Sequence, residues 1–413
     1  MNVKIIPSPL SGEVKIPPSK SAAHRALICA ALSEGESRVT PFCTSKDLKA
    51  TAECLRQLGL RVDATEDGYV VGREKASEKA DLNFGESGST ARFLLPIAAA
   101  LGVNATATGE GRLPERPMEI ITSLLRAHEV KVSADKLPLT LEGRLTAGEF
   151  ALPGDVSSQY ISGLMLAAPL MEGETNIKLT TPPQSVGYID MTIDAMARQG
   201  VKVCETAEGW RIEKGQSYKP TDIEIEGDWS QAAFFMSASA IGGDIKISGL
   251  DFASRQGDMA ALDVFAAFGA DINIIDNVLQ VRKGTLRGIE VNAADIPDMV
   301  PAIAATAAFA KGKTVIHSAE RLRIKESDRI KTTLAALNAL GIKTEERPDG
   351  MVIYGGNPKG GLIDGANDHR IVMAFAVAAA FAEGESEITM AEAVNKSYPE
   401  FFEDFKSIGG KTE

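Results

Sequence analysis

The sequence has no excess of basic residues, since 44 lysines and arginines face 56 aspartates and glutamates and the formal net charge is −12. Nucleic acids and anionic membranes require a basic surface on their partner, either overall or in a dense local patch. We therefore expect neither as a partner. Any positively charged site in this acidic chain must be a local cluster.

Long apolar runs are also missing. The longest, residues 371–382, has 12 residues, whereas a bilayer span needs about 20, and the N-terminal residues lack the apolar core of a signal peptide. The four cysteines are Cys29, Cys43, Cys54 and Cys204, and their spacing suits neither a metal site nor a disulfide framework. We interpret them as core residues in a reducing compartment, and we predict a cytoplasmic location.

The sequence does contain an internal repeat. With 413 residues, of which 44% are apolar and 24% charged, the chain is too long for one typical core. Apolar, alanine-rich segments typical of helices recur along it, and each ends at a glycine. They begin at Ser21, Ser89, Ser157, Ser230, Asp298 and Asp368, and they end at Gly35, Gly102, Gly173, Gly242, Gly312 and Gly384. The glycines are 67 to 72 residues apart, which predicts six copies of one unit.

Each copy is predicted to contain a strand, a helix, a strand, a helix and two further strands. The second helix is amphipathic, and it ends near Gly59, His128, Gly200, Gly269, Gly341 and Gly409. Two strands typical of a hairpin follow it in the first five copies. Because a helix that is apolar all round needs burial all round, the first helix of each copy is interior and the second peripheral.

We therefore predict an α/β (α+β) fold with two lobes of three copies each. Lobe II comprises residues 19–227. Lobe I comprises residues 1–18, whose strand joins the last three copies, together with residues 228–413. Two chain crossings, near Pro17-Pro18 and Gly227, would form a hinge between the lobes.

Residues 321–329 read R-L-R-I-K-E-S-D-R, with four cations and two carboxylates, and the apolar spacing that follows predicts a helix. Free backbone N–H groups and the positive end of the helix dipole favour an anion at such a start. Lys325 and Arg329 would add full charges there. Glu326, held among these cations, is an acid whose protonation could be tuned for chemistry. The alternative interpretation is a solvated run of charges.

Further cations are predicted at comparable helix starts. The seven candidates are Lys20, Arg25, Arg116, Lys325, Arg329, Arg370 and Lys396. Serine, glutamine and glycine donors lie among them, and the set suits substrates with several negative charges, such as phosphates and carboxylates. Each position alone could be only a helix cap or a loop residue. Asp298 and Glu326, two acids without an obvious structural role, are the candidates for proton transfer.

Six motifs occur in order along the chain. They are P-S-K-S-A-A-H-R at 18–25, E-R-P-M at 115–118, S-S-Q-Y at 157–160, K-E-S-D-R at 325–329, N-D-H-R at 367–370 and K-S-Y-P at 396–399. Together they closely resemble the 5-enolpyruvylshikimate-3-phosphate synthase family over the whole chain. The resemblance implies a transferase that moves the enolpyruvyl group of phosphoenolpyruvate to the 5-hydroxyl of shikimate 3-phosphate and releases phosphate, in the biosynthesis of chorismate and aromatic amino acids. It also implies no metal or organic cofactor, a pseudo-threefold arrangement within each lobe, and an active site in the cleft between the lobes.

The resemblance implies roles for individual residues. Shikimate 3-phosphate would be held by Lys20, Ser21, Arg25, Ser157, Ser158, Gln159, Ser185, Asp298 and Lys325. Phosphoenolpyruvate would meet Lys20, Gly88, Arg116, Gln159, Arg329, Arg370 and Lys396. Asp298 would take the proton of the 5-hydroxyl, and Glu326 would be the acid at the methylene carbon. Lys20 and Lys396 are further catalytic candidates.

The sequence departs from the family pattern at two places. Arg321 stands where many relatives have asparagine, so it is not assigned to a ligand. Residues 86–90 read E-S-G-S-T in place of the common N-A-G-T-A, which leaves the affinity for phosphoenolpyruvate and for glyphosate, the family's inhibitor, open.

Three alternative functions fit the sequence less well. The UDP-N-acetylglucosamine enolpyruvyl transferases typically have a cysteine in the loop that precedes their R-P motif, whereas residues 109–116 contain none. A non-catalytic binder of phosphorylated metabolites is disfavoured by Asp298 and Glu326, because two carboxylates would repel an anion. A nucleic-acid role like that of the distantly similar RNA 3′-phosphate cyclases conflicts with the acidic balance. We expect a monomer whose partners are the two small-molecule substrates.

Overall fold

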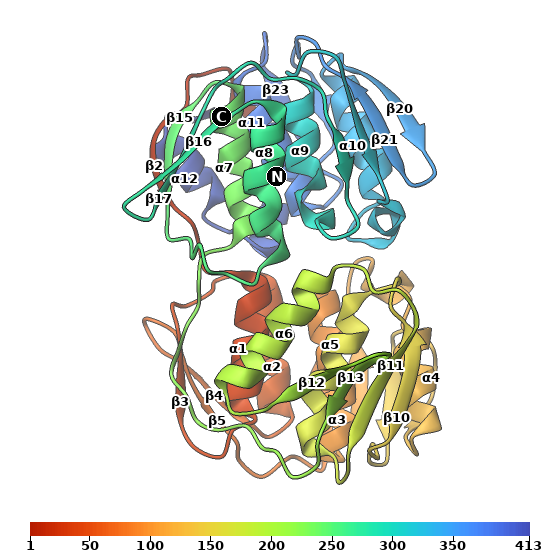
Figure 1. Cartoon of the computed structure of the whole chain (residues 1–413). Helices are drawn as coiled ribbons and strands as arrows, with labels where there is room; N and C mark the ends of the chain where they lie inside the picture. The colour runs from red at the N-terminus through yellow and green to blue at the C-terminus, as the bar shows by residue number, and fades with distance from the viewer. The chain divides into compact units, whose positions relative to one another are not determined.

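The computed structural model describes residues 1–413, and the chain forms two compact units (Figure 1). Unit 1 comprises Met1–Pro17 and Glu226–Glu413, and unit 2 comprises Pro18–Ile225. These boundaries lie one and two residues before the positions expected from the sequence. The second one is earlier because Gly227 N already donates to the carbonyl of Gly249, which belongs to unit 1 (3.0 Å).

Unit 2 contains the first three copies of the repeat. The first has α1 (Lys20–Ala31), β3 (Ser37–Thr40), α2 (Lys46–Gln57), β4 (Arg61–Ala64) and β5 (Tyr69–Gly72). The second has β6 (Lys79–Asn83), α3 (Gly88–Leu101), β7 (Asn104–Thr108), the 3₁₀ helix η1 (Leu113–Glu115), α4 (Glu119–Ala127), β8 (Lys131–Val132) and β9 (Leu139–Glu142). The third has β10 (Glu149–Pro153), α5 (Ser158–Ala167), η2 (Ala168–Leu170), β11 (Thr175–Thr181), α6 (Val186–Arg198), β12 (Val203–Thr206) and β13 (Gly209–Ile212), and it is followed by β14 (Ile223–Glu224).

Unit 1 contains the other three copies and the N-terminal strands β1 (Val3–Ile6) and β2 (Ser11–Lys15). The fourth copy has α7 (Trp229–Ile241), β15 (Asp244–Ser248), η3 (Gly257–Ala260), α8 (Ala261–Phe268), β16 (Asp271–Ile275) and β17 (Val278–Arg282). The fifth has β18 (Glu290–Asn292), η4 (Pro297–Met299), α9 (Val300–Ala307), β19 (Lys313–His317), η5 (Glu320–Ile324), α10 (Arg329–Ala339), β20 (Lys343–Arg347) and β21 (Gly350–Tyr354). The sixth has β22 (Leu362–Ile363), α11 (His369–Ala380), β23 (Ser386–Ile388), η6 (Ala391–Lys396), α12 (Phe401–Ser407) and β24 (Lys411–Thr412).

Every copy corresponds to one four-stranded sheet with the same pattern. The orders are β14-β3-β5-β4, β6-β7-β9-β8 and β10-β11-β13-β12 in unit 2, and β2-β15-β17-β16, β18-β19-β21-β20 and β22-β23-β1-β24 in unit 1. The first pair in each sheet is parallel, with Ala80 opposite Ala105 in one of them, and the other two pairs are antiparallel. The predicted α/β fold of six repeated copies is confirmed.

Two strands belong to a different unit from the helix that follows them. β2 directly precedes α1 but pairs in parallel with β15 of unit 1, whereas β14 precedes α7 but pairs with β3 of unit 2. β1 pairs with both β23 and β24 and completes the sixth sheet. This pairing explains why the sixth copy has no hairpin of its own in the sequence.

The inner helices are buried on all sides. All residues of α7, from Trp229 to Ile241, and all of α11, from His369 to Ala380, are buried. In unit 1, α7, α9 and α11 contact one another, and in unit 2, α3 contacts α5 while α1 packs on α2 and α6 (Figure 1). The outer helix α2 buries only the face that carries Leu48 and Leu55, as expected of an amphipathic helix. None of the helices is both long and apolar enough to cross a bilayer.

Candidate functional site

The candidate residues form one cluster in each unit. The α1–α3–α5 cluster lies in unit 2 and comprises Lys20, Ser21, Arg25, Gly88, Arg116, Ser157, Ser158, Gln159 and Ser185. The Asp298 cluster lies in unit 1 and comprises Asp298, Lys325, Glu326, Arg329, Arg370 and Lys396.

These residues lie at equivalent positions in the copies of the repeat. Lys20, Arg329 and Arg370 stand in the first turn of a helix, as predicted. Three further cations lie instead at the end of a 3₁₀ helix that precedes an outer helix: they are Arg116 after η1, Lys325 after η5 and Lys396 at the end of η6. Asp298 is likewise in the 3₁₀ helix η4, not at the first residue of an α-helix. The flanking prolines at 297 and 301 are compatible with such an irregular first turn.

Lys20 is paired with an acid that the sequence analysis did not single out. Its Nζ lies 2.7 Å from Oδ2 of Asp47, and both side chains are only 12% exposed. Asp47 is in the first turn of α2, which Ser45 caps by accepting from Leu48 N. The ion pair therefore fixes the lysine at the start of α1 against the start of the neighbouring helix α2.

Arg25 is buried and bound only by neutral acceptors. Its Nε donates to Thr192 Oγ1 (2.7 Å), and its Nη1 and Nη2 donate to the carbonyls of Ser21 (2.8 Å) and Tyr188 (2.9 Å). Burial lowers its pKa to about 10, because no carboxylate compensates the charge. Arg25 therefore joins α1 to the start of α6, next to Ser185, whose backbone is left-handed (φ 57°).

Gln159 is held between α3 and α5. Its Oε1 accepts from Arg92 Nη1 (2.7 Å), and its Nε2 donates to Ser89 Oγ (2.8 Å). Arg92 also donates to the carbonyl of Pro117 (3.4 Å) and lies over the ring of Tyr160, 5.2 Å from its centroid. These contacts orient the amide of Gln159 at the start of α5. The partners of Arg92 are thus an amide and a carbonyl, and neither is a carboxylate.

Gly88 permits a close approach of two guanidinium groups, which a Cβ atom at this position would displace. A Cβ atom at this position would lie 2.7 Å from Nη1 of Arg116 and 2.8 Å from Nη1 of Arg92. Two guanidinium groups therefore lie directly beside the backbone at the start of α3. Free N–H groups and nearby positive charge make this helix start suitable for a phosphate or carboxylate oxygen.

In unit 1, one carboxylate is shared by three cations. Asp298 Oδ1 lies 2.9 Å from Arg329 Nη1 and 3.5 Å from Lys325 Nζ, and its Oδ2 lies 2.9 Å from Arg370 Nη2. Arg370 Nη1 also donates to the Asp298 carbonyl (3.1 Å). Burial lowers the pKa of Lys325, although Asp298 opposes that effect. Asp298, which lies in η4, therefore contacts cations from the segment after η5, from α10 and from α11.

Arg329 is the centre of this network and its side chain is 1% exposed. Its Nη2 donates to Glu326 (2.7 Å), and its Nε donates to Asp368 (2.8 Å), which caps α11 and accepts from Ser327 (2.9 Å). Burial alone would lower the pKa of Arg329, but its carboxylate partners raise it. The residue thus stays charged inside the unit and holds both candidate proton-transfer acids, Asp298 and Glu326.

Two further cations, Lys396 and Arg321, donate to backbone carbonyls. Lys396 Nζ donates to the carbonyl of Asn367 (2.7 Å), which places it beside the start of α11. Arg321, unassigned by sequence, donates to the carbonyl of Ala294 (2.7 Å). Arg323 binds Asp328 and Glu346 (3.3 and 2.8 Å), so part of the charge run at 321–329 is indeed a surface ion-pair network.

Two acids next to the clusters were missed. Asp47 and Asp258 belong to the first turns that lead into α2 and α8, the two outer helix starts that the sequence analysis passed over. Asp258 accepts from Ser230 Oγ, and burial, reinforced by Asp298, raises its pKa to about 6. A signal for both acids is present in the sequence, because they stand at starts of outer helices, as the predicted residues Arg116, Lys325 and Lys396 do.

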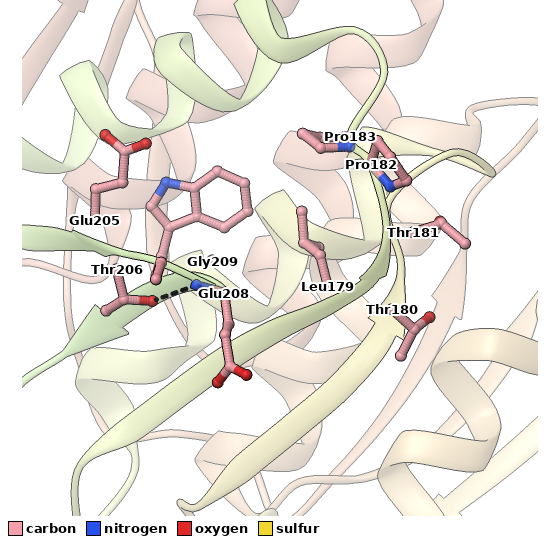
Figure 2. Close-up of a pocket in the computed structure, with 11 residues that line it drawn as sticks. Leu179, Thr180, Thr181, Pro182, Pro183, Glu205, Thr206, Glu208 and Gly209 are labelled. Atoms are coloured by element: carbon pink, nitrogen blue, oxygen red, sulfur yellow. Dashed lines mark hydrogen bonds between the residues drawn. The ribbon is translucent and has the colours of Figure 1, made fainter.

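A separate hollow in unit 2 does not suit anions (Figure 2). It has a volume of about 400 Å³ and is lined by Leu179, Thr180, Thr181, Pro182, Pro183, Glu205, Thr206, Ala207, Glu208, Gly209 and Trp210. Figure 2 shows Thr180–Pro183 on one segment facing Glu205, Thr206 and Glu208 on the other, where Glu208 N donates to Thr206 Oγ1 (3.4 Å). Two carboxylates and no lysine or arginine line this hollow. It is therefore not the candidate site.

The cation-rich clusters, by contrast, can bind several phosphate and carboxylate groups and contain two acids for proton transfer. Comparison with known proteins agrees. The family model of EPSP synthase (3-phosphoshikimate 1-carboxyvinyltransferase) matches residues 5–405. A 3-phosphoshikimate 1-carboxyvinyltransferase of Clostridium novyi (strain NT) is 41% identical over 424 residues, covering 99% of this chain and 98% of that protein. Its namesake in Clostridium acetobutylicum is 42% identical over 418 residues, covering 99% and 97%.

Solved structures agree as well. The structure of an EPSP synthase from Acinetobacter baumannii superposes with a TM-score of 0.83 at 28% identity, covering 100% of this chain and 99% of that chain. The fold and the sequence thus match along their whole length. The chain belongs to the EPSP synthase (3-phosphoshikimate 1-carboxyvinyltransferase) family.

Proposed function

We propose that this chain transfers the enolpyruvyl group of phosphoenolpyruvate to the 5-hydroxyl of shikimate 3-phosphate and releases phosphate, in the biosynthesis of chorismate and the aromatic amino acids. One geometric observation carries the proposal. Asp298 and Glu326, the two acids that the reaction requires, both contact the buried guanidinium of Arg329, at 2.9 and 2.7 Å. A mere anion-binding site would gain nothing from two carboxylates placed among its cations.

Both clusters contribute to substrate binding in this proposal. Shikimate 3-phosphate is bound by Lys20, Ser21, Arg25, Ser157, Ser158, Gln159, Ser185, Asp298 and Lys325. Phosphoenolpyruvate is bound by Lys20, Gly88, Arg116, Gln159, Arg329, Arg370 and Lys396. Because these residues come from both units, the proposed reaction requires both units to bind the same substrates.

The chemistry begins with a proton added to C3 of phosphoenolpyruvate by Glu326. C2 then becomes cation-like and is attacked by the 5-hydroxyl oxygen, whose proton passes to Asp298. The tetrahedral adduct expels phosphate by cleavage of the bond between C2 and the phosphate oxygen, and C3 returns its proton to Glu326. The hydroxyl proton held by Asp298 passes to the departing phosphate, so both acids return to their starting states. One carboxyl therefore acts first as an acid and then as a base. Lys20 and Lys396 stabilise the charge that develops on the phosphate.

The cations around Asp298 change partners in this scheme. Lys325 and Arg370 share the Asp298 carboxylate. An anionic substrate offers them an alternative acceptor, and the carboxylate of Asp298 becomes available to the 5-hydroxyl. Arg329 retains Asp368, which is 0% exposed, and so keeps its position during the exchange. We also propose that the chain acts as a monomer in the cytoplasm.

The test is phosphate release by the purified protein supplied with phosphoenolpyruvate and shikimate 3-phosphate. The matched control replaces shikimate 3-phosphate by UDP-N-acetylglucosamine. We expect release with shikimate 3-phosphate alone. Release with the sugar nucleotide alone would assign the chain to the other transferase reaction, and no release with either acceptor would overturn the proposed enzymatic function.

A further inference from the structure

A buried chain of hydrogen bonds connects three helices of unit 2 behind the α1–α3–α5 cluster. His24 Nδ1 on α1 lies 2.8 Å from Thr51 Oγ1 on α2, which lies 2.7 Å from Thr90 Oγ1 on α3. Thr90 Oγ1 in turn donates to the Oγ of Ser87, the residue that caps α3 (2.6 Å). All four side chains are at most 1% exposed.

The direction of this chain follows from counting hydrogens, because each hydroxyl has only one. The hydroxyl hydrogen of Thr90 goes to Ser87 Oγ or to the nearby carbonyl of Asp47 (3.3 Å), so the Thr90 oxygen accepts from Thr51. The Thr51 oxygen must then accept from His24. This order fixes the ring of His24 as the tautomer that carries its hydrogen on Nδ1.

The other ring nitrogen agrees with that assignment. Nε2 of His24 is buried and has no hydrogen-bond partner, which costs less for a bare nitrogen than for an N–H group without an acceptor. Burial, helped by the charges of Lys20 and Arg25, holds the pKa of His24 well below 6.5, so the ring is neutral. The edge of the ring faces Phe93, with the centroids 6.4 Å apart.

Both ends of the chain adjoin predicted phosphate ligands. Lys20 lies four residues before His24, on the same face of α1, and its partner Asp47 offers the carbonyl that Thr90 contacts. At the other end, Gly88 lies between the cap Ser87 and Thr90, with its N–H at the open start of α3. The chain therefore sets the position of α3 relative to the ammonium group of Lys20.

We propose that Thr51 is a positioning residue for the phosphoenolpyruvate phosphate: through the His24 N–H and Thr90 it holds the start of α3 at the distance from Lys20 that the anion requires. This inference rests on the proposed function for its kinetic consequence. Thr51 touches no substrate, and it acts only through the two helix starts that it connects.

The test compares three variants in the full chain. Thr51→Val keeps the shape of the side chain but removes the hydroxyl, Thr51→Ser keeps the hydroxyl, and Thr333→Val is the matched control. Thr333 is also fully buried on a helix, but its hydroxyl has no partner. We expect Thr51→Val to raise the KM for phosphoenolpyruvate by about tenfold and to change kcat by less than about threefold, as loss of a buried hydrogen bond predicts. The other two variants should match the parent chain.

A second measurement does not depend on turnover. Long-range ¹H–¹⁵N spectra of the parent chain should show the proton of His24 on Nδ1 and a bare Nε2, and this tautomer should be lost or mixed in Thr51→Val. A proton on Nε2 in the parent chain would overturn the proposal even if the enzyme is active. An unchanged KM in a folded Thr51→Val variant would also overturn it, whereas the correct tautomer in an inactive protein would count only against the proposed function.

Discussion

The two clusters hold their cations in different ways. In the α1–α3–α5 cluster of unit 2, Arg25 and Arg92 are bound by hydroxyls, carbonyls and an amide, and none of these partners is a carboxylate. In the Asp298 cluster of unit 1, the buried Arg329 contacts three carboxylates, those of Asp298, Glu326 and Asp368. In unit 2, Lys20 is paired with the carboxylate of Asp47, but no carboxylate compensates the charge of Arg25 or Arg92. In unit 1, the buried cations share their charge with acids of the protein.

This difference indicates that the two clusters have different roles. Cations held by neutral dipoles form a preorganised anion site, since no internal carboxylate has to be displaced before the ligand binds. Cations shared with carboxylates instead create a place where protons can move, because a small change of partner alters which acid is compensated. We infer that both units bind anionic groups and that unit 1 in addition performs the proton transfers.

The largest effect is expected when the proposed base is removed. Asp298→Asn keeps the shape of the side chain but cannot accept the 5-hydroxyl proton, so kcat should fall by about 10²- to 10⁴-fold, the usual contribution of general acid–base catalysis. Steady-state phosphate release measures the effect. Circular dichroism of the same sample should match the parent chain. A variant with parental kcat would remove Asp298 from its role.

The next largest effect is on the free energy of unfolding, which can be compared between the two clusters. Arg329→Met leaves buried carboxylates uncompensated and should lower the free energy of unfolding by about 3–5 kcal/mol. Arg92→Met removes only hydrogen bonds to neutral partners and should cost about 1–2 kcal/mol. Urea denaturation of both variants provides the comparison. Equal losses would mean that the difference in partners has no energetic consequence.

The pH dependence of stability should show the buried acid of unit 1. The pKa of Asp258 is raised from 3.8 to about 6 in the folded chain. Between pH 4 and 6 the unfolded carboxyl has lost its proton while the folded one retains it, so stability falls as the pH rises through this range. Relative to Asp258→Asn, the parent chain should lose up to about 3 kcal/mol over that interval. Urea unfolding at several pH values tests the sign, and a parent chain that gains stability would contradict it.

The smallest effect is expected from a side chain added at the start of α3. In Gly88→Ala the new Cβ meets the ends of two flexible arginines, Arg116 and Arg92, so the fold should tolerate it while the guanidinium groups move. We expect the KM for phosphoenolpyruvate to rise by about tenfold, the effect of weakening one charged hydrogen bond. The binding of shikimate 3-phosphate, measured by calorimetry, should change less than the KM for phosphoenolpyruvate. The reverse order of effects would mean that Gly88 adjoins the other substrate.

The sequence predicted the repeat because burial has a simple periodic signature. Helices such as α7, apolar on every side, must be interior, and a strand, helix and strand in each copy leave few alternatives. The predicted positions of Lys325 and Lys396 at helix starts were less accurate, because 3₁₀ segments such as η5 and η6 have no clear periodic pattern in the sequence.

Partners that are distant in sequence could not be predicted. Lys20 and Asp47 are 27 residues apart, and Asp298 and Arg370 are 72 apart, so their contacts depend on how neighbouring copies pack. The same holds for the bond between His24 and Thr51, because neither residue type reveals its partner. Motifs located the cations, whereas only the packed helices determine which acceptor holds each one.

The most direct test that unit 1 performs the proton transfers is a single-turnover experiment with Glu326→Gln. Phosphate release is followed at saturating phosphoenolpyruvate and shikimate 3-phosphate, and the Kd of shikimate 3-phosphate is measured by calorimetry on the same sample. We expect a rate that is lower by at least about 100-fold and a Kd within about threefold of the parent value. A parental rate, or a Kd that rises as much as the rate falls, would show that Glu326 does not have the proposed role in proton transfer.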